Sequence, residues 1–73
     1  MLGEREAIVL EARAFQVHGV PHYDVTLGFP DRSVVSARLG AESVPADLAQ
    51  GDRVLASLAM NMVVAIRKPD PEA

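Results

Sequence analysis

The fold is decided by the stretch YDVTLGFPDRSVVSARL, which runs from Tyr23 to Leu39. Apolar and polar residues alternate along it, and Pro30-Asp31 interrupts the alternation once. A period of two is typical of a β-strand with one buried and one exposed face, and proline favours the first central position of a tight turn. The stretch therefore predicts two strands, near 21–29 and 33–39, joined by a turn.

The same period of two recurs elsewhere in the chain. It predicts three further strands, near 6–15, 53–59 and 62–67. Two dipeptides, His18-Gly19 and Met60-Asn61, separate neighbouring strands. Both contain a residue that tolerates a positive φ, so we expect a turn at each of them.

Residues 40–51 lose the alternation and contain glycine, proline and acids, which predicts a loop with at most one helical turn. The chain therefore reads as three strands, this connection and two more strands. Small alanines at several inward positions suit a tightly curved sheet that closes on itself. We expect an all-β fold, a small five-stranded OB-like barrel, with an SH3-like barrel as the alternative. The expected core consists of Ile8, Leu10, Val25, Leu27, Val35, Val54 and Ile66.

The composition limits the class of protein. Its 73 residues allow one domain, 1–73, with short acidic tails at 1–6 and 69–73. The chain has no cysteine, which excludes disulfides and thiolate zinc sites. The net charge is −3, without the basic excess typical of nucleic-acid binders. The longest apolar run, 54–66, is shorter than the about 20 residues of a membrane helix. We expect a cytoplasmic protein with no membrane contact.

Catalytic patterns are missing from the sequence. No serine lies in a nucleophile elbow, and no carboxylate pair marks a cleft. His18, His22 and Asp24 are close enough in sequence to suggest a metal site, but their loose spacing favours a polar turn beside a solvated strand. We therefore expect no enzyme activity, no catalytic residue, no metal site and no cofactor.

A second apolar set lies at positions that the alternation predicts to face outward. An apolar patch on a small domain is typical of an interface. We take Val9, Val34, Leu55, Val63 and Phe15 as candidate interface residues. They predict a non-catalytic binding or assembly module, either a homo-oligomer or one that binds a protein partner.

Four arginines support an alternative function. Arg13, Arg38, Arg53 and Arg67 are predicted to face outward, one on each of four strands. OB barrels bind single strands by combining a basic groove with aromatic stacking. Single-stranded nucleic-acid binding is therefore the second hypothesis.

The residues from Val34 onward resemble a known family. They read VVSARL at 34–39, ESV at 42–44 and LAQGDRVLASL at 48–58. This order, with an Ala-Arg pair, a Glu-Ser-Val segment and a Gly-Asp turn before a Val-x-Ala strand, resembles the TOBE and molbindin domains over roughly 34–66. These domains are small OB-like barrels.

The resemblance implies a third function. Stand-alone members of that family are oligomers that hold molybdate or a similar oxyanion between subunits, and fused members regulate a transporter ATPase. The family's oxyanion-contacting motifs are absent, since Gly3-Glu4-Arg5-Glu6 and Ala59-Met60-Asn61 stand in their places. Oxyanion binding or transporter regulation is therefore the third hypothesis.

Overall fold

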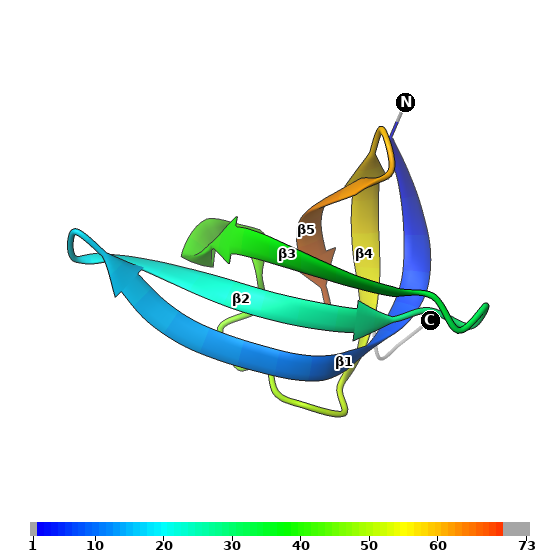
Figure 1. Cartoon of the computed structure of the whole chain (residues 1–73), viewed down its shortest axis with the longest axis horizontal. Helices are drawn as coiled ribbons and strands as arrows, with labels where there is room; N and C mark the ends of the chain where they lie inside the picture. Colours follow the sequence, from blue (N-terminus) through cyan, green and yellow to red (C-terminus); the bar gives the residue numbers. More distant parts are fainter. Residues whose placement is uncertain (1, 70–73) are drawn as a thin grey trace.

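Five antiparallel strands form one strongly curled sheet in a computed structural model, which describes residues 2–69 (Figure 1). The strand order is β3-β2-β1-β4-β5. The elements are β1 (Leu2–Val17), β2 (Val20–Gly28), β3 (Val34–Gly40), the 3₁₀ turn η1 (Ala41–Ser43), β4 (Arg53–Ala59) and β5 (Met62–Arg67). The prediction of a five-stranded all-β fold is confirmed. The sheet curls into a half-barrel, which is consistent with a small barrel of the OB or the SH3 type.

The first strand holds the two halves of the sheet together. β1 pairs with β4 along its first half and with β2 along its second half, and Ile8 pairs with both Arg53 and Gly28. Val9 continues this double role, because its N–H donates to the Asp52 carbonyl (2.9 Å) and its carbonyl accepts from the Gly51 N–H (2.7 Å). β1 therefore bends where it exchanges one neighbour for the other.

The core lies on the concave face of the sheet. Its members are Ala7, Val9, Val25, Leu27, Phe29, Leu39, Val44, Val54, Ala56, Val63 and Ile66. Among the predicted core residues, Val25, Leu27, Val54 and Ile66 are buried, and the half-buried Val35 packs against them. The prediction for Ile8 and Leu10 is wrong, because both side chains are exposed.

A β-bulge in β1 explains these two errors, and the sheet contains a second bulge in β5. The β1–β2 register shifts between Val9 and Glu11, which leaves Leu10 as the extra residue. The β4–β5 register shifts between Ser57 and Leu58, which leaves Val64 without a partner on β4. One inserted residue exchanges the inward and outward faces of a strand, so an alternation that is correct on one side of a bulge is inverted on the other.

The predicted turns are confirmed, whereas one predicted boundary is wrong. The turns at His18-Gly19 and Met60-Asn61 are confirmed, since all four residues have positive φ. The turn after Phe29 is closed by a bond from the Arg32 N–H to the Phe29 carbonyl (2.9 Å). The predicted tail at 1–6 is wrong for residues 2–6, which pair with β4 as part of β1. The predicted tail at 69–73 lies, apart from Pro69, outside the described residues, as does Met1.

The loop between β3 and β4 contains the single predicted helical turn. η1 spans three residues, and no helical segment in the described part of the chain has the length and hydropathy needed to span a bilayer. Lys68 at the end of β5 fastens this loop, with its Nζ 3.0 Å from Asp47 Oδ2 and 3.4 Å from Asp52 Oδ2. The hydrogen bond and charge of Lys68 lower the pKa of Asp47.

Candidate interaction surface

Three apolar side chains gather on the convex face of the sheet, where β1, β2 and β3 lie side by side. Ile8, Gly28 and Val34 occupy one rung across the three strands. The Leu10 side chain lies over Gly28, since its Cδ1 is 3.3 Å from the place that a Cβ on Gly28 would take. Ile8, Leu10 and Val34 are 46%, 42% and 61% exposed. We call these three residues the outer apolar patch.

Glycine at position 28 is what allows the outer apolar patch to be continuous. A Cβ there would stand between Ile8 and Val34, 3.3 Å from Leu10 Cδ1, so the Leu10 side chain would have to shift slightly. A hollow of about 340 Å³ adjoins the patch and is lined by Glu6, Ala7, Ile8, Gly28, Phe29, Pro30 and Arg53. The patch therefore combines a raised side chain, Leu10, with a depression beside it.

Four charged residues next to the outer apolar patch have no ion-pair partner among the described residues. Glu6 and Arg53 lie on its β4 side, and Glu11 and Arg13 follow Leu10 along β1. All four are exposed, and none makes an ion pair with another residue between positions 2 and 69. An apolar patch flanked by two acids and two bases without partners has the composition of an interface with a polar rim.

Most charged residues farther from the patch pair within the chain, and Arg32 and Glu42 are the exceptions among residues 2–69. Arg67 binds Glu4 in a bidentate manner, with Nε 2.7 Å from Oε2 and an Nη 2.9 Å from Oε1. Hydrogen bonding from Arg67 lowers the pKa of Glu4. Arg5 lies over the Phe29 ring and pairs with Asp31 at 3.4 Å. Hydrogen bonds from Ser33 are the main cause of the lowered pKa of Asp31.

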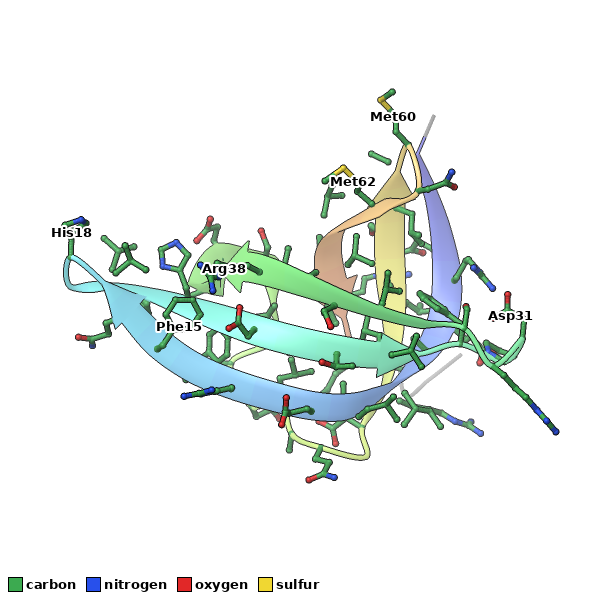
Figure 2. All side chains as sticks on the ribbon, viewed as in Figure 1. Phe15, His18, Asp31, Arg38, Met60 and Met62 are labelled. Atoms are coloured by element: carbon green, nitrogen blue, oxygen red, sulfur yellow. The ribbon has the colours of Figure 1, made fainter. Side chains whose placement is uncertain are left out.

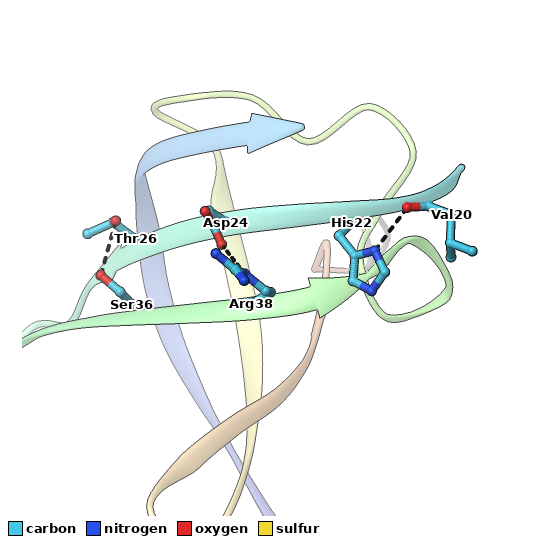
Figure 3. A network of polar contacts seen from close by, with 6 residues as sticks. All are labelled: Val20, His22, Asp24, Thr26, Ser36 and Arg38. Carbon is cyan, nitrogen blue, oxygen red and sulfur yellow. Dashed lines mark hydrogen bonds and ion pairs between the residues drawn. The ribbon is translucent and has the colours of Figure 1, made fainter. Parts of the chain in front are cut away.

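A row of polar contacts covers the outer face of β2 and β3 (Figure 3). Thr26 and Ser36 share a hydrogen bond of 3.3 Å, and Arg38 Nε donates to Asp24 Oδ1 at 3.0 Å. The bond to Asp24 raises the pKa of Arg38. His22 Nδ1 lies 3.0 Å from the Val20 carbonyl oxygen. Each of these polar side chains therefore has a hydrogen-bond partner within the chain.

The two histidines do not join Asp24 in a metal site. His18 is at the tip of the β1–β2 hairpin, and Asp24 is engaged by Arg38 (Figures 2 and 3). His22 packs against Phe15 instead, with ring centroids 5.8 Å apart. No group of three His, Cys, Asp or Glu side chains within residues 2–69 is arranged to hold a metal ion.

The four arginines predicted to bind nucleic acid fall into two groups. Arg13 and Arg38 flank Asp24 on one rung, and Arg38 also covers the Phe15 ring at 4.7 Å. Arg53 and Arg67 lie on the β4–β5 half, where Arg67 is bound to Glu4. An electrostatic track for a phosphate backbone requires a continuous basic surface. The four arginines do not form such a surface, because they are divided between two halves of the sheet and two of them are bound to acids.

The predicted interface residues are also divided. Val34 is exposed as expected, whereas Val9 and Val63 belong to the core and are not accessible to a partner. Leu55 and Phe15 are half-buried. The predictions for Val9 and Val63 are wrong because a bulge follows each of them. The inserted residue inverts the alternation, as it does for Ile8 and Leu10.

Sequence reasoning missed Ile8 and Leu10 as surface residues. Both lie in the run AIVL at 7–10, which has no polar residue to indicate the exposed side. The run VVAI at 63–66 holds the second bulge and has the same property. In a half-buried strand, an uninterrupted apolar run does not indicate which side chains face the core and which face outward.

A second exposed apolar feature is the tip of the β4–β5 hairpin (Figure 2). Met60 is 88% exposed, and Met62 is exposed beside it. Met60 and Asn61 both have positive φ, the conformation of a two-residue hairpin turn. This tip belongs to β4 and β5, whereas the outer apolar patch belongs to β1 and β3.

Comparison of the chain with protein-family models, with curated proteins and with solved structures found no match.

Proposed function

We propose that this protein is a non-catalytic assembly module that associates with a second copy of itself through the outer apolar patch. The observation that carries the proposal is the continuous exposure of Ile8, Leu10 and Val34 over Gly28. Scattered apolar residues are ordinary on a protein surface, but contiguous ones favour an interface. A half-barrel of this size also gains from association, because a small domain buries a low fraction of its surface by itself.

The size of the patch predicts a weak complex. Full burial of a Val, Leu or Ile contributes about 1.5–3 kcal/mol, and these three side chains are already about half-buried. Six such side chains in a dimer then contribute about 6 kcal/mol, whereas association costs about 4–15 kcal/mol. Apolar contact alone reaches only the low end of that cost. Polar contacts at the rim must therefore supply most of the net affinity, and we expect dissociation constants of about 0.1–1 mM, which correspond to about −5.5 to −4 kcal/mol.

The arrangement of strands supports an OB-type barrel as the scaffold of this module. We favour it over the SH3 type because β1 is long, bends sharply and pairs with both β2 and β4. The chain also places η1 and the loop that follows between β3 and β4, within the stretch 34–66 that resembles the TOBE and molbindin domains. The OB type places the outer apolar patch on the convex side, away from the interior.

Sedimentation equilibrium and light scattering between about 1 μM and 1 mM test the proposal. We expect the average mass of the wild-type chain to rise towards twice the monomer mass. Leu10→Ser is expected to keep the chain monomeric over most of that range. Met60→Ser is the matched control, because it removes a more exposed apolar side chain outside the patch and should leave the mass unchanged.

Two outcomes would contradict the proposal. A wild-type chain that stays monomeric throughout the range removes self-association. Dissociation by Met60→Ser, with Leu10→Ser behaving as wild type, places the contact at the β4–β5 tip instead of the patch. Far-UV circular dichroism of each variant verifies that the sheet is intact.

A further inference from the structure

The unpaired charges beside the outer apolar patch have an order along β1 that is its own complement. Glu6 precedes the patch on β1, with Arg53 paired to Ile8 beside it. Glu11 and Arg13 follow Leu10 on the same strand. At one end an acid is outermost along β1, and at the other end a base is outermost. Reversing the direction of β1 therefore exchanges acid for base.

This order selects one way of placing two copies face to face. When the two β1 strands cross the interface antiparallel, the end with Glu6 and Arg53 lies opposite the end with Glu11 and Arg13 of the other copy. When they are parallel, each charge meets its own like charge. Opposing like charges are destabilising, and complementary ones fix the register of an interface. The antiparallel arrangement is therefore the favoured one.

We propose that the dimer is isologous, with its two-fold axis beside Leu10, and that Glu6 pairs with Arg13 of the partner subunit while Arg53 pairs with Glu11 of the partner subunit. The inference rests on the proposed self-association and adds its geometry. Two-fold symmetry is the commonest in soluble oligomers, and it repeats each contact. The dimer then has four ion pairs at its rim around the six apolar side chains of the two patches.

The shape of the surface supports the same arrangement. Leu10 is the raised residue of the patch, and the hollow lined by Glu6, Gly28, Pro30 and Arg53 lies next to Ile8. A two-fold axis beside Leu10 brings the Leu10 side chains of both copies together at the centre. It leaves the two charged ends at the rim of the interface, where complementary charges fix the register of the two copies.

A charge exchange within one chain tests the inference. Glu6→Lys places a cation opposite Arg13 of the partner subunit, and Arg13→Glu places an anion opposite the partner's Glu6. Each change occurs twice in the dimer, so we expect either single variant to weaken dimerisation about tenfold or more. The double variant E6K/R13E restores opposite charges and is expected to return to within about threefold of the wild type.

Glu42→Lys is the matched control for the change of net charge. Glu42 is exposed and makes no ion pair within residues 2–69, and it lies on η1, beyond the end of β3 that is far from Val34. We expect its dimerisation constant to equal that of the wild type. Raising the salt concentration should weaken the wild-type dimer and the double variant alike, because rim ion pairs are screened.

Four results distinguish the fate of this inference from that of the proposed function. Recovery of dimerisation in E6K/R13E supports the antiparallel pairing. A double variant as weak as the single ones overturns the pairing of Glu6 with Arg13 of the partner subunit, and so does a set of variants that all dimerise like the wild type, although self-association stands in both cases. A wild-type chain that never dimerises removes both.

Discussion

The two halves of β1, before and after Leu10, place their side chains by opposite rules. Before Leu10 the even-numbered residues face outward, so that Ile8 is exposed and Val9 is buried. After it the odd-numbered residues face outward, and Ala12 packs against the core. The two halves also have different neighbours, β4 first and then β2. A single inserted residue therefore allows one strand to belong to both halves of the sheet.

The difference shows why the outer apolar patch exists at this position. At a bulge, two consecutive residues oppose one on the neighbouring strand, so one of them cannot continue the alternation. Leu10 is that residue, and it lies on the outer face over Gly28 without entering the core. The patch is a consequence of the bend that allows β1 to serve both halves.

The largest expected effect comes from placing the same acid on the buried side and on the exposed side of the first half of β1. Val9→Asp places a carboxylate at a position with 0% exposure and should unfold the chain, since an unpaired buried charge costs about 3–5 kcal/mol and the core of so small a domain rarely supplies more than about 3–5 kcal/mol. Ile8→Asp changes an exposed neighbour and should change the free energy of unfolding by less than about 1 kcal/mol. Urea denaturation followed by circular dichroism measures both. A folded Val9→Asp chain beside an unfolded Ile8→Asp chain would mean that β1 faces the other way.

A smaller effect is expected where the loop before β4 meets the bend of β1. Gly51 has φ +90° and donates its N–H to Val9, so Gly51→Ala retains the bond but strains the backbone by about 1–2 kcal/mol. Gly3→Ala is the matched control, because Gly3 lies in β1 without a positive φ and has open space around a Cβ. We expect Gly3→Ala to leave the urea midpoint unchanged or slightly raised. Equal midpoints for the two variants would show that the loop conformation does not constrain the bend.

The sequence predicts those parts of the fold in which polar residues mark the exposed side. The stretch from Tyr23 to Leu39 alternates on both sides of the turn at Pro30-Asp31, so both strands and their buried side chains follow from it. The runs at 7–10 and 63–66 contain no polar residue, and each holds a bulge that no local pattern indicates. The position of a bulge depends on where β1 must exchange β4 for β2, which is a property of the whole sheet.

The candidate surface was predictable to the same extent. Val34 follows from alternation, because it stands next to Val35 in a strand whose inward side is clear. Its neighbours Ile8 and Leu10 become surface residues only through the bulge. The pairing of Arg67 with Glu4, and the lack of an ion pair for Arg53 within residues 2–69, depend on contacts between strands far apart in sequence. Composition gives the net charge of −3, but only the strand order determines which acids and bases pair.

The smallest expected effect concerns the outward face of the first half of β1, where Glu4 binds Arg67 across β4. Its pKa is lowered from 4.5 by hydrogen bonds from Arg67, so the folded chain holds the Glu4 proton less tightly than the unfolded chain. This contribution to stability is present above the unfolded value and is lost as the pH falls through the lower folded value. Glu4→Gln should therefore reduce stability at neutral pH and flatten its decline below about pH 4.5.

Urea midpoints at neutral pH and at about pH 3.5 measure this change in slope. Some decline should remain in Glu4→Gln, because Asp31 and Asp47 also have lowered pKa values. Glu42→Gln is the control, since Glu42 makes no ion pair within residues 2–69, and its profile should follow the wild type. Identical profiles for the two variants would show that Arg67 does not stabilise ionised Glu4, and that the outward face of the first half of β1 is held by packing alone.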